Sequence, residues 1–162
     1  MKHYHACPIM LDVGSVILPG NWGRLEKASL GAGSPIIFRE YVLESLRAKE
    51  FPDKPSRMQA TYSCPDIQSM VMFMQANCPT SLCYEVEIID REAPAHRAPC
   101  KIVGPADNQN TWDWAMSEAA KYWSWNQEHV LRPMEMVSAS PLRIISKGKN
   151  LQEVLPLAQT SL

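Results

Sequence analysis

The side chains best suited to chemistry in this sequence are a histidine, a tyrosine and a glutamate in three separate predicted elements. His5 lies in a short aromatic strand over residues 2–7, and Tyr62 lies in a strand candidate over 56–64. Glu135 begins a third strand candidate over 134–139. A carboxylate can stabilise positive charge that develops during a reaction, an aromatic ring can hold a cationic group, and an imidazole can hydrogen-bond hydroxyls. These three residues are therefore candidate site residues.

Each candidate also has a structural interpretation. A histidine in a strand is more often a satisfied structural group than a ligand contact, and a tyrosine is often the edge of a core. A strand glutamate most often faces solvent. A neighbouring cation, Arg57, follows Ser56 and has an ion pair with Asp53 or Glu50 as its structural alternative. The order of the residues along the chain, and not any one of them, favours the functional interpretation.

Composition places the chain among ordinary globular proteins. Its 162 residues are 46% hydrophobic and 20% charged, with a net charge of −1. This length predicts one domain over residues 1–148, followed by a weakly specified tail over 149–162. The charge gives no general attraction to nucleic acid or to anionic membranes. No apolar run reaches the length of a membrane span, and no secretory signal is visible, so we expect a cytoplasmic protein.

Cysteine and histidine spacing gives no metal site. The cysteine count is odd and no C-x-x-C pair occurs, which predicts five free thiols in a reducing compartment, at Cys7, Cys64, Cys78, Cys83 and Cys100. His3 and His5 would share one strand face, but no third ligand is evident near them.

The first half of the chain mixes loops, helices and short strands. Residues 20–33 contain several glycines, a pattern that predicts an irregular loop. Ser34 as an N-cap predicts a helix over 36–49, with Glu40 and Glu44 on its solvated side. The apolar stripe predicted for this helix is Phe38, Tyr41, Val42, Ser45, Leu46 and Lys49. Asp66 predicts the cap of a second helix.

The second half contains the clearest strand, over 83–89, where apolar residues alternate with Glu85 and Glu87. Residues 90–109 predict a loop with a short strand candidate at 100–103. Asn110 predicts the cap of a helix that extends to 126, with Trp112 on its apolar stripe. Strands over 134–139 and 142–146 follow. Without regular βαβ alternation, the pattern favours the α+β class.

Read in order, these motifs resemble the ADP-ribosyltransferase-like superfamily in its His-Tyr-Glu form, and in particular small bacterial and phage members. The motifs are Tyr4-His5-Ala6 in the opening strand, then Ser56-Arg57 with Tyr62, and finally Glu135 within Pro133-Met134-Glu135-Met136-Val137. A glycine-bounded loop at 14–20 follows the first motif. The resemblance covers residues 2–147 and implies a split β-sheet core flanked by helices.

The resemblance also implies NAD as the substrate and transfer of its ADP-ribose group. Cleavage of the bond between nicotinamide and ribose places positive charge on the sugar, which the carboxylate of Glu135 would stabilise. Tyr62 would hold the nicotinamide ring, and His5 would donate a hydrogen bond to a ribose hydroxyl. Guanidinium groups suit the pyrophosphate. The implied NAD-binding residues are His5, Ala6, Arg24, Arg57 and Tyr62.

The acceptor of the ADP-ribose group stays open, and a protein or a nucleic acid would fit. Pro133 stands where arginine-specific members carry a second acidic residue, which argues against an arginine acceptor. Tyr84 is the alternative aromatic residue if the second motif is aligned differently. The superfamily analogy implies a toxin, defence or counter-defence role.

Two alternatives remain at this stage. One is a non-catalytic module of the same fold that binds NAD, a nucleotide or a protein. The other is an RNA 2′-phosphotransferase-like activity, which would rely on several arginines and a histidine and has no use for Glu135 in its cleft.

Overall fold

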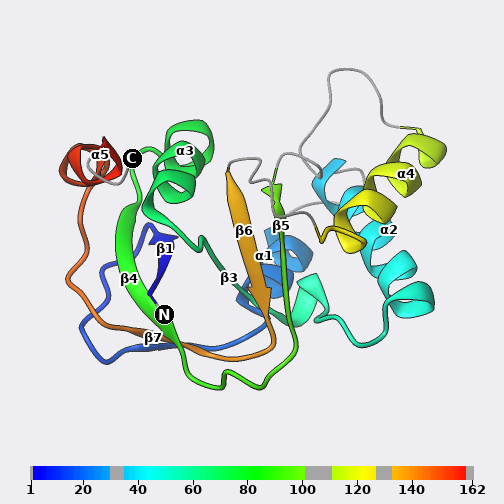
Figure 1. Cartoon of the computed structure of the whole chain (residues 1–162), viewed down its shortest axis with the longest axis horizontal. Coiled ribbons are helices and arrows are strands. Elements are labelled where there is room, and N and C mark those ends of the chain that lie inside the picture. Colours follow the sequence, from blue (N-terminus) through cyan, green and yellow to red (C-terminus); the bar gives the residue numbers. More distant parts are fainter. Residues whose placement is uncertain (1, 30–34, 101–110, 127–132, 160–162) are drawn as a thin grey trace.

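A computed structural model describes residues 2–29, 35–100, 111–126 and 133–159 of the chain. Within these residues, five α-helices accompany two antiparallel β-sheets (Figure 1). The α+β class expected from the sequence is confirmed.

The strands form two sheets whose members alternate along the chain. Sheet A has the order β1-β4-β7-β2, with bounds His3–Cys7, Leu82–Ile88, Leu142–Ile144 and Val16–Ile17. Sheet B has the order β3-β6-β5, with bounds Thr61–Ser63, Met134–Ser138 and Ala95–Pro99. The sheets meet where β1 passes the end of β3: the backbone N–H of Tyr4 donates to Cys64 O at 2.8 Å, and the N–H of Cys64 donates to Tyr4 O at 2.7 Å.

The helices cover the sheets in two groups. Their bounds are α1 Asn21–Ser29, α2 Pro35–Glu50, the 3₁₀ turn η1 Arg57–Gln59, α3 Ile67–Asn77, α4 Trp112–Trp123 and α5 Leu151–Gln159. In Figure 1, α2 and α4 lie at the right beside sheet B, whereas α3 and α5 lie at the upper left beside β4. The connection from η1 to β3 carries the chain from the α2 side to the junction of the sheets.

Hydrophobic cores form on both sides of this junction. Under α2 and α4, Leu43, Trp123 and Val137 are almost completely buried in one cluster, and the indole N–H of Trp123 donates to Leu43 O at 2.9 Å. Under α3 and α5, Met74 and Val154 belong to a second cluster. A third cluster lies between the strands of sheet A. At the junction, side chains of β1 also reach β3: His3 Nδ1 lies 3.2 Å from Ser63 Oγ, and His5 Nδ1 lies 2.8 Å from Tyr62 O.

Three elements depart from the sequence expectations. The loop predicted over 20–33 contains α1, the loop predicted over 90–109 contains β5, and the tail after 148 contains α5. In each case tertiary contact outweighs local propensity. Val154 on α5 is 1% exposed, so the expectation of a frayed tail is wrong for residues 151–159.

Other expectations are confirmed in outline. The carboxylate of Asp66 accepts from the backbone N–H of Ser69 at 2.7 Å and caps α3. The 83–89 strand is β4, and the helices near 36–49 and 110–126 are α2 and α4. The 56–64 strand candidate divides into η1 and β3. Ser34, Asn110 and 101–103 lie outside the described residues.

The buried faces of α2 and α4 agree with the predicted stripes in part, since Val42, Leu46 and Trp123 are buried. Tyr41 on α2 and Trp112 on α4 are exposed, and Leu43 and Tyr122 are buried in their place. Glu40, expected on the solvated side, is fully buried.

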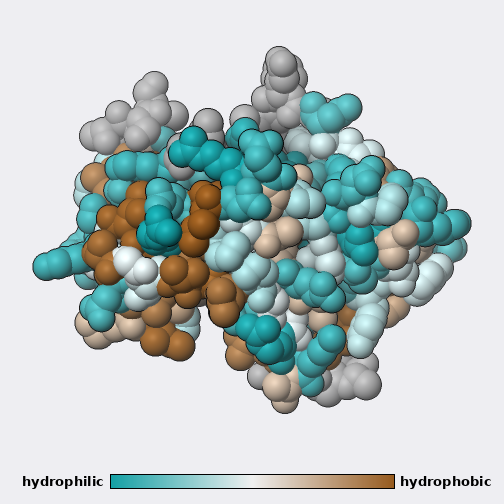
Figure 2. Space-filling view, turned by 90° about the horizontal axis from the view of Figure 1, so that it is seen from below, coloured by the Kyte–Doolittle hydropathy of each residue, from teal (hydrophilic) through white to brown (hydrophobic). Residues whose placement is uncertain are grey.

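Exposed apolar side chains concentrate in the connection from β1 to α1. Ile9, Met10, Val13 and Leu18 are each more than half exposed. Figure 2 shows hydrophobic surface gathered at the left of the underside, the sheet A side of the molecule. Among the described residues, no helix has the length and apolar character needed to cross a membrane.

The close approach of α1 to η1 generates a stability prediction. A Cβ added at Gly23 would lie 2.1 Å from the backbone oxygen of Met58, so a larger residue must push α1 away from η1. We expect Gly23→Ala to lower the free energy of unfolding by about 1–3 kcal/mol, as overpacking does. Urea denaturation would measure it, with Lys27→Ala on the exposed face of α1 as the control. A Gly23→Ala protein stabilised by about 1 kcal/mol, as helix propensity alone predicts, would contradict this contact.

Candidate functional site

The candidate site is built around the buried guanidinium of Arg57. This residue opens η1 and is 4% exposed. Its partners come from three other elements: Glu40 of α2, Tyr122 of α4 and Glu135 of β6. Together with Tyr62 of β3, these residues are called the Arg57 cluster.

One edge of the guanidinium is held by Glu40. Nε of Arg57 donates to Glu40 Oε2 at 2.8 Å, and Nη2 donates to Glu40 Oε1 at 3.2 Å. Arg39, next to Glu40 on α2, also donates to Glu40 Oε1, at 3.0 Å. A two-pronged arginine–carboxylate pair of this kind fixes the plane of the guanidinium.

The opposite tip of the guanidinium holds Glu135. Nη1 of Arg57 donates to Glu135 Oε1 and, at 2.6 Å, to the hydroxyl of Tyr122. That hydroxyl donates in turn to the same Glu135 Oε1 at 2.7 Å. Both hydrogen bonds that Glu135 accepts therefore fall on one carboxylate oxygen. Oε2 of Glu135 accepts no hydrogen bond from the described residues and is not among their buried, unpartnered polar atoms. Oε2 is therefore the atom of this carboxylate available to a ligand.

Two tyrosine rings enclose the guanidinium. The Cζ atom of Arg57 lies 5.1 Å from the ring centre of Tyr62 and 5.0 Å from that of Tyr122. The hydroxyl of Tyr62 donates to the backbone oxygen of Arg57 at 2.6 Å. The ring of Trp22 on α1 meets Tyr62 edge-on at 6.3 Å. Aromatic faces stabilise a cation, so the two rings add to the stabilisation of the Arg57 charge.

His5 joins the cluster through the backbone of Tyr62. Its Nδ1 lies 2.8 Å from Tyr62 O, and because a carbonyl only accepts, Nδ1 carries the proton. Burial lowers the pKa of His5, which favours the neutral ring. Nε2 of the neutral ring is then an acceptor. Toward a hydroxyl, His5 would accept a hydrogen bond in this state rather than donate one as the sequence suggested.

Electrostatics fix the protonation states of the cluster. Burial alone would lower the pKa of Arg57, but the carboxylates of Glu135 and Glu40 raise it well above its usual value. Burial alone would raise the pKa of Glu40, but Arg57 and Arg39 outweigh it and lower that pKa. Burial raises the pKa of Tyr62 and Tyr122. At neutral pH the tyrosines are neutral, and Arg57 and Glu40 are charged.

Support for Tyr122 comes from a second histidine. Nε2 of His96 donates to the backbone oxygen of Tyr122 at 2.8 Å, and its Nδ1 accepts from Lys54 Nζ at 3.0 Å. Burial lowers the pKa of His96 to about 4, so the ring stays neutral. The imidazole thereby fixes the last turn of α4 against β5.

The structure brings four of the predicted site residues into one connected set. His5 contacts Tyr62, Tyr62 contacts Arg57, and Arg57 contacts Glu135. The ion pairs of Arg57 are with Glu40 and Glu135, and not with either of the neighbours considered from sequence.

The other predicted contacts lie outside the cluster. Ala6 pairs with Cys83 in sheet A, and Arg24 is exposed on α1, where it donates to the side chain of Asn21. Tyr84, the alternative aromatic residue, is buried in sheet A, where its hydroxyl accepts from Leu11 N and donates to Ile9 O. A pyrophosphate contact by Arg24 or Arg57 stays a prediction.

Sequence reasoning missed Glu40 and Tyr122. Glu40 lies three residues before Leu43, which lies three residues before Leu46, so the three share the buried face of α2. Ala115, Ala119 and Tyr122 follow the same periodicity on α4. Apolar spacing therefore marks both positions, but only the partners in the fold show that a charge is accommodated there.

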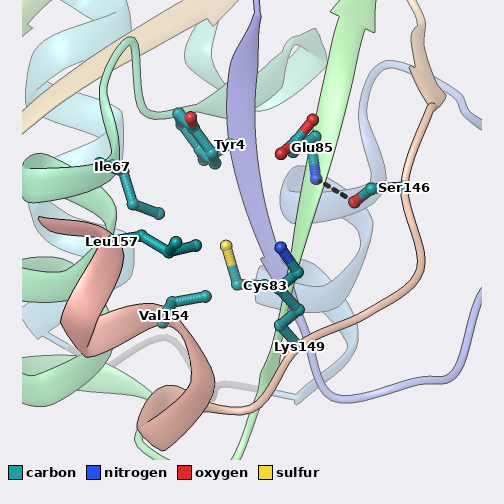
Figure 3. A pocket seen from close by; sticks show the side chains of 8 residues that line it. All are labelled: Tyr4, Ile67, Cys83, Glu85, Ser146, Lys149, Val154 and Leu157. Carbon is teal, nitrogen blue, oxygen red and sulfur yellow. Dashed lines mark hydrogen bonds between the residues drawn. The ribbon is translucent and has the colours of Figure 1, made fainter. Parts of the chain in front are cut away.

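A shallow pocket elsewhere shares no residue with the Arg57 cluster. Figure 3 shows it between β4 and α5, with Ile67, Val154 and Leu157 on one side and Glu85, Ser146 and Lys149 on the other. Across the described ranges, no group of three histidine, cysteine or acidic side chains could hold a metal ion.

Comparison with known proteins gives a family. Residues 28–150 match the family described as protein of unknown function (DUF2441). The chain belongs to this family. The matched range contains every member of the Arg57 cluster but neither His5 nor Trp22. The family description assigns no activity. No curated protein matches the chain.

The buried ion pairs generate a second prediction. Arg57→Met leaves the buried Glu135 without its cation and leaves Glu40 with Arg39 alone. We expect a loss of about 3–5 kcal/mol in the free energy of unfolding at pH 7. Arg143→Met is the control, because the Arg143–Glu87 pair is exposed and worth at most about 1 kcal/mol. Denaturant titration at several pH values would measure both.

The pH dependence has a definite sign. The lowered pKa of Glu40 stabilises the native fold above the ordinary glutamate value of about 4.3, and this contribution is lost as pH falls through the folded value. The difference in the free energy of unfolding between the native and Arg57→Met proteins should therefore become smaller in acid. A small difference in the free energy of unfolding at pH 7, or a difference that grows in acid, would contradict a stabilising role for these ion pairs.

Proposed function

We propose that this protein is a mono-ADP-ribosyltransferase that transfers ADP-ribose from NAD to a macromolecular acceptor, with Glu135 as the catalytic carboxylate. The observation that carries the proposal is the state of Glu135. One oxygen is fixed by Arg57 and Tyr122, and the other accepts no hydrogen bond from the described residues. A carboxylate held in this way is oriented before a ligand arrives.

Two further features support the same function. His5, Tyr62 and Glu135, which the superfamily resemblance singles out, belong to one connected set of contacts. The division of the strands into two sheets that meet at β1 and β3 agrees with the split sheet that the resemblance implies.

The reaction makes specific demands on these residues. The bond between the ribose carbon and the nicotinamide nitrogen breaks, and its electron pair leaves with nicotinamide. Positive charge develops on the sugar, where a carboxylate lowers the barrier. The acceptor nucleophile then bonds to the ribose carbon and loses a proton. Oε2 of Glu135 would face the sugar, and Nε2 of His5 would accept from a ribose hydroxyl.

The alternative is a binding module of the same fold that holds NAD, another nucleotide or a protein without catalysis. Its supporting observation is the burial of Glu135, whose side chain is only 11% exposed. A carboxylate enclosed to this extent also serves a purely structural ion pair.

Nicotinamide release distinguishes the two functions. The purified protein would be incubated with labelled NAD and cell lysate as a source of acceptor, beside Glu135→Gln. The matched control is Glu87→Gln, which removes a carboxylate from the exposed pair with Arg143. We expect Glu135→Gln to slow nicotinamide release and label transfer by about 10²-fold or more, because the charge that stabilises the transition state is gone. Glu87→Gln should retain native rates.

Calorimetry with NAD on the same proteins completes the test. Binding by the native protein without release or transfer would favour the binding module. Absence of both binding and turnover would reject the NAD-dependent function altogether.

A further inference from the structure

We propose that Ser69 is a positioning residue for Glu135. Its hydroxyl holds the backbone of β6 at Met134, one residue before Glu135, where no strand pairs with β6 on that side. The catalytic consequence of this contact rests on the proposed function. The contact and its coupling to Glu135 belong to the folded chain, so one arm of the experiment measures them without turnover.

The start of β6 lacks a partner strand on the side of β3. The register of β3 against β6 ends at Ser63 and Met136. The next residue of β3, Cys64, instead exchanges two backbone hydrogen bonds with Tyr4 of β1. Continuation of the register would have placed residue 65 opposite Met134. The division into two sheets therefore removes the strand partner of Met134.

The backbone N–H of Met134 faces this unpaired side. Cys100 N donates to Pro133 O at 2.9 Å, so Pro133 directs its carbonyl group toward the β5 side of the sheet. Successive residues of an extended chain direct their backbone groups to opposite sides, so Met134 directs its N–H away from β5. Met134 is 2% exposed, and a buried N–H without an acceptor would be unfavourable.

Ser69 supplies the missing acceptor. Its Oγ accepts from Met134 N at 3.1 Å, and its hydroxyl donates to Asp66 Oδ2 at 2.9 Å. Ser69 is fully buried, and its two partners give the hydroxyl one orientation, with the proton toward Asp66 and a lone pair toward Met134. In Figure 1, α3 lies beside the upper end of β6, where this strand begins.

The contact fixes the part of β6 from which Glu135 projects. Arg57 and Tyr122 hold only Oε1 of the carboxylate, so the direction of Oε2 depends on where the backbone places the side chain. Pairing with Ala98 on β5 holds one side of the backbone at Glu135, and Ser69 holds the other side one residue earlier. A displacement of about 1 Å at a reacting group can lower the rate by about 10²-fold.

The test compares Ser69→Ala with the matched control Ser140→Ala. Both serines are buried, and the Oγ of Ser140 also accepts from a backbone N–H, that of Asp90 at 2.8 Å, while its hydroxyl donates to Pro141 O at 2.9 Å. Ser140 lies two residues after the end of β6, at the opposite end of the strand from Glu135. Each variant loses one buried acceptor, and both should keep a cooperative unfolding transition in urea.

The kinetic arm measures nicotinamide release as a function of NAD concentration. We expect Ser69→Ala to lower kcat by about tenfold or more and to keep KM within about twofold, because the ground-state contacts of NAD are retained. Ser140→Ala should keep the native kcat. In a Glu135→Gln background, Ser69→Ala should lower the residual rate by less than about twofold, because a residue that acts through Glu135 has no further effect once that carboxylate is removed.

The second arm needs no turnover. Urea denaturation of the native protein, of Ser69→Ala, of Glu135→Gln and of the variant that carries both substitutions forms a double-mutant cycle. If Ser69 sets how Glu135 meets Arg57, the combined loss in the folding equilibrium constant should differ from the product of the two single losses by at least about threefold. The same cycle with Ser140→Ala should agree with the product within about twofold.

The outcomes separate the two proposals. A native kcat in Ser69→Ala, or a loss that persists in full in the Glu135→Gln background, overturns the positioning role and leaves the transferase function standing. A cycle without coupling between Ser69 and Glu135 overturns the positioning role whether or not the protein is active. Coupling in a protein that never cleaves NAD retains Ser69 as the residue that sets the position of Glu135 and rejects the transferase function.

Discussion

The burial of one guanidinium is the constraint on which the rest of this structure depends. A cation taken out of water costs several kcal/mol unless oxygen acceptors surround it. Arg57 meets this cost with two carboxylates and a hydroxyl, and with two tyrosine rings over its faces. Because these partners belong to α2, α4, β3 and β6, all four elements must converge on η1.

The two sheets meet next to this convergence, because β3 carries both Tyr62 and the end that pairs with β1. The apolar clusters lie to either side of it, under α2 with α4 and under α3 with α5. At the junction, His5 reaches the backbone of Tyr62 and His3 reaches the hydroxyl of Ser63, so β1 is tied to β3 by side chains as well as by main chain. The polar residues thus fix how one sheet meets the other, and the apolar residues fix how each is covered.

The same charges determine what the site can do. A buried carboxylate with both oxygens paired is inert, whereas Glu135 keeps one oxygen without a hydrogen bond from the described residues. The second carboxylate, Glu40, accepts from Nε and Nη2 of the same guanidinium. The description of the DUF2441 family names no activity. The proposal of ADP-ribosyl transfer therefore rests on the geometry of the cluster and on the order of the motifs.

The sequence by itself determined the class of fold, the main helices, the β4 strand and three of the residues that meet in the cluster. Periodicity is local, so it marks where a helix or strand forms within a few residues. Only the tertiary structure decided the partners of Arg57, because Glu40 lies 17 positions away and Glu135 lies 78 positions away. Sequence periodicity predicted Glu40 on the solvated side of its helix, because burial of a carboxylate is unfavourable without a partner, and an isolated helix shows no partner. Its burial becomes favourable only when the fold brings a guanidinium to the same place.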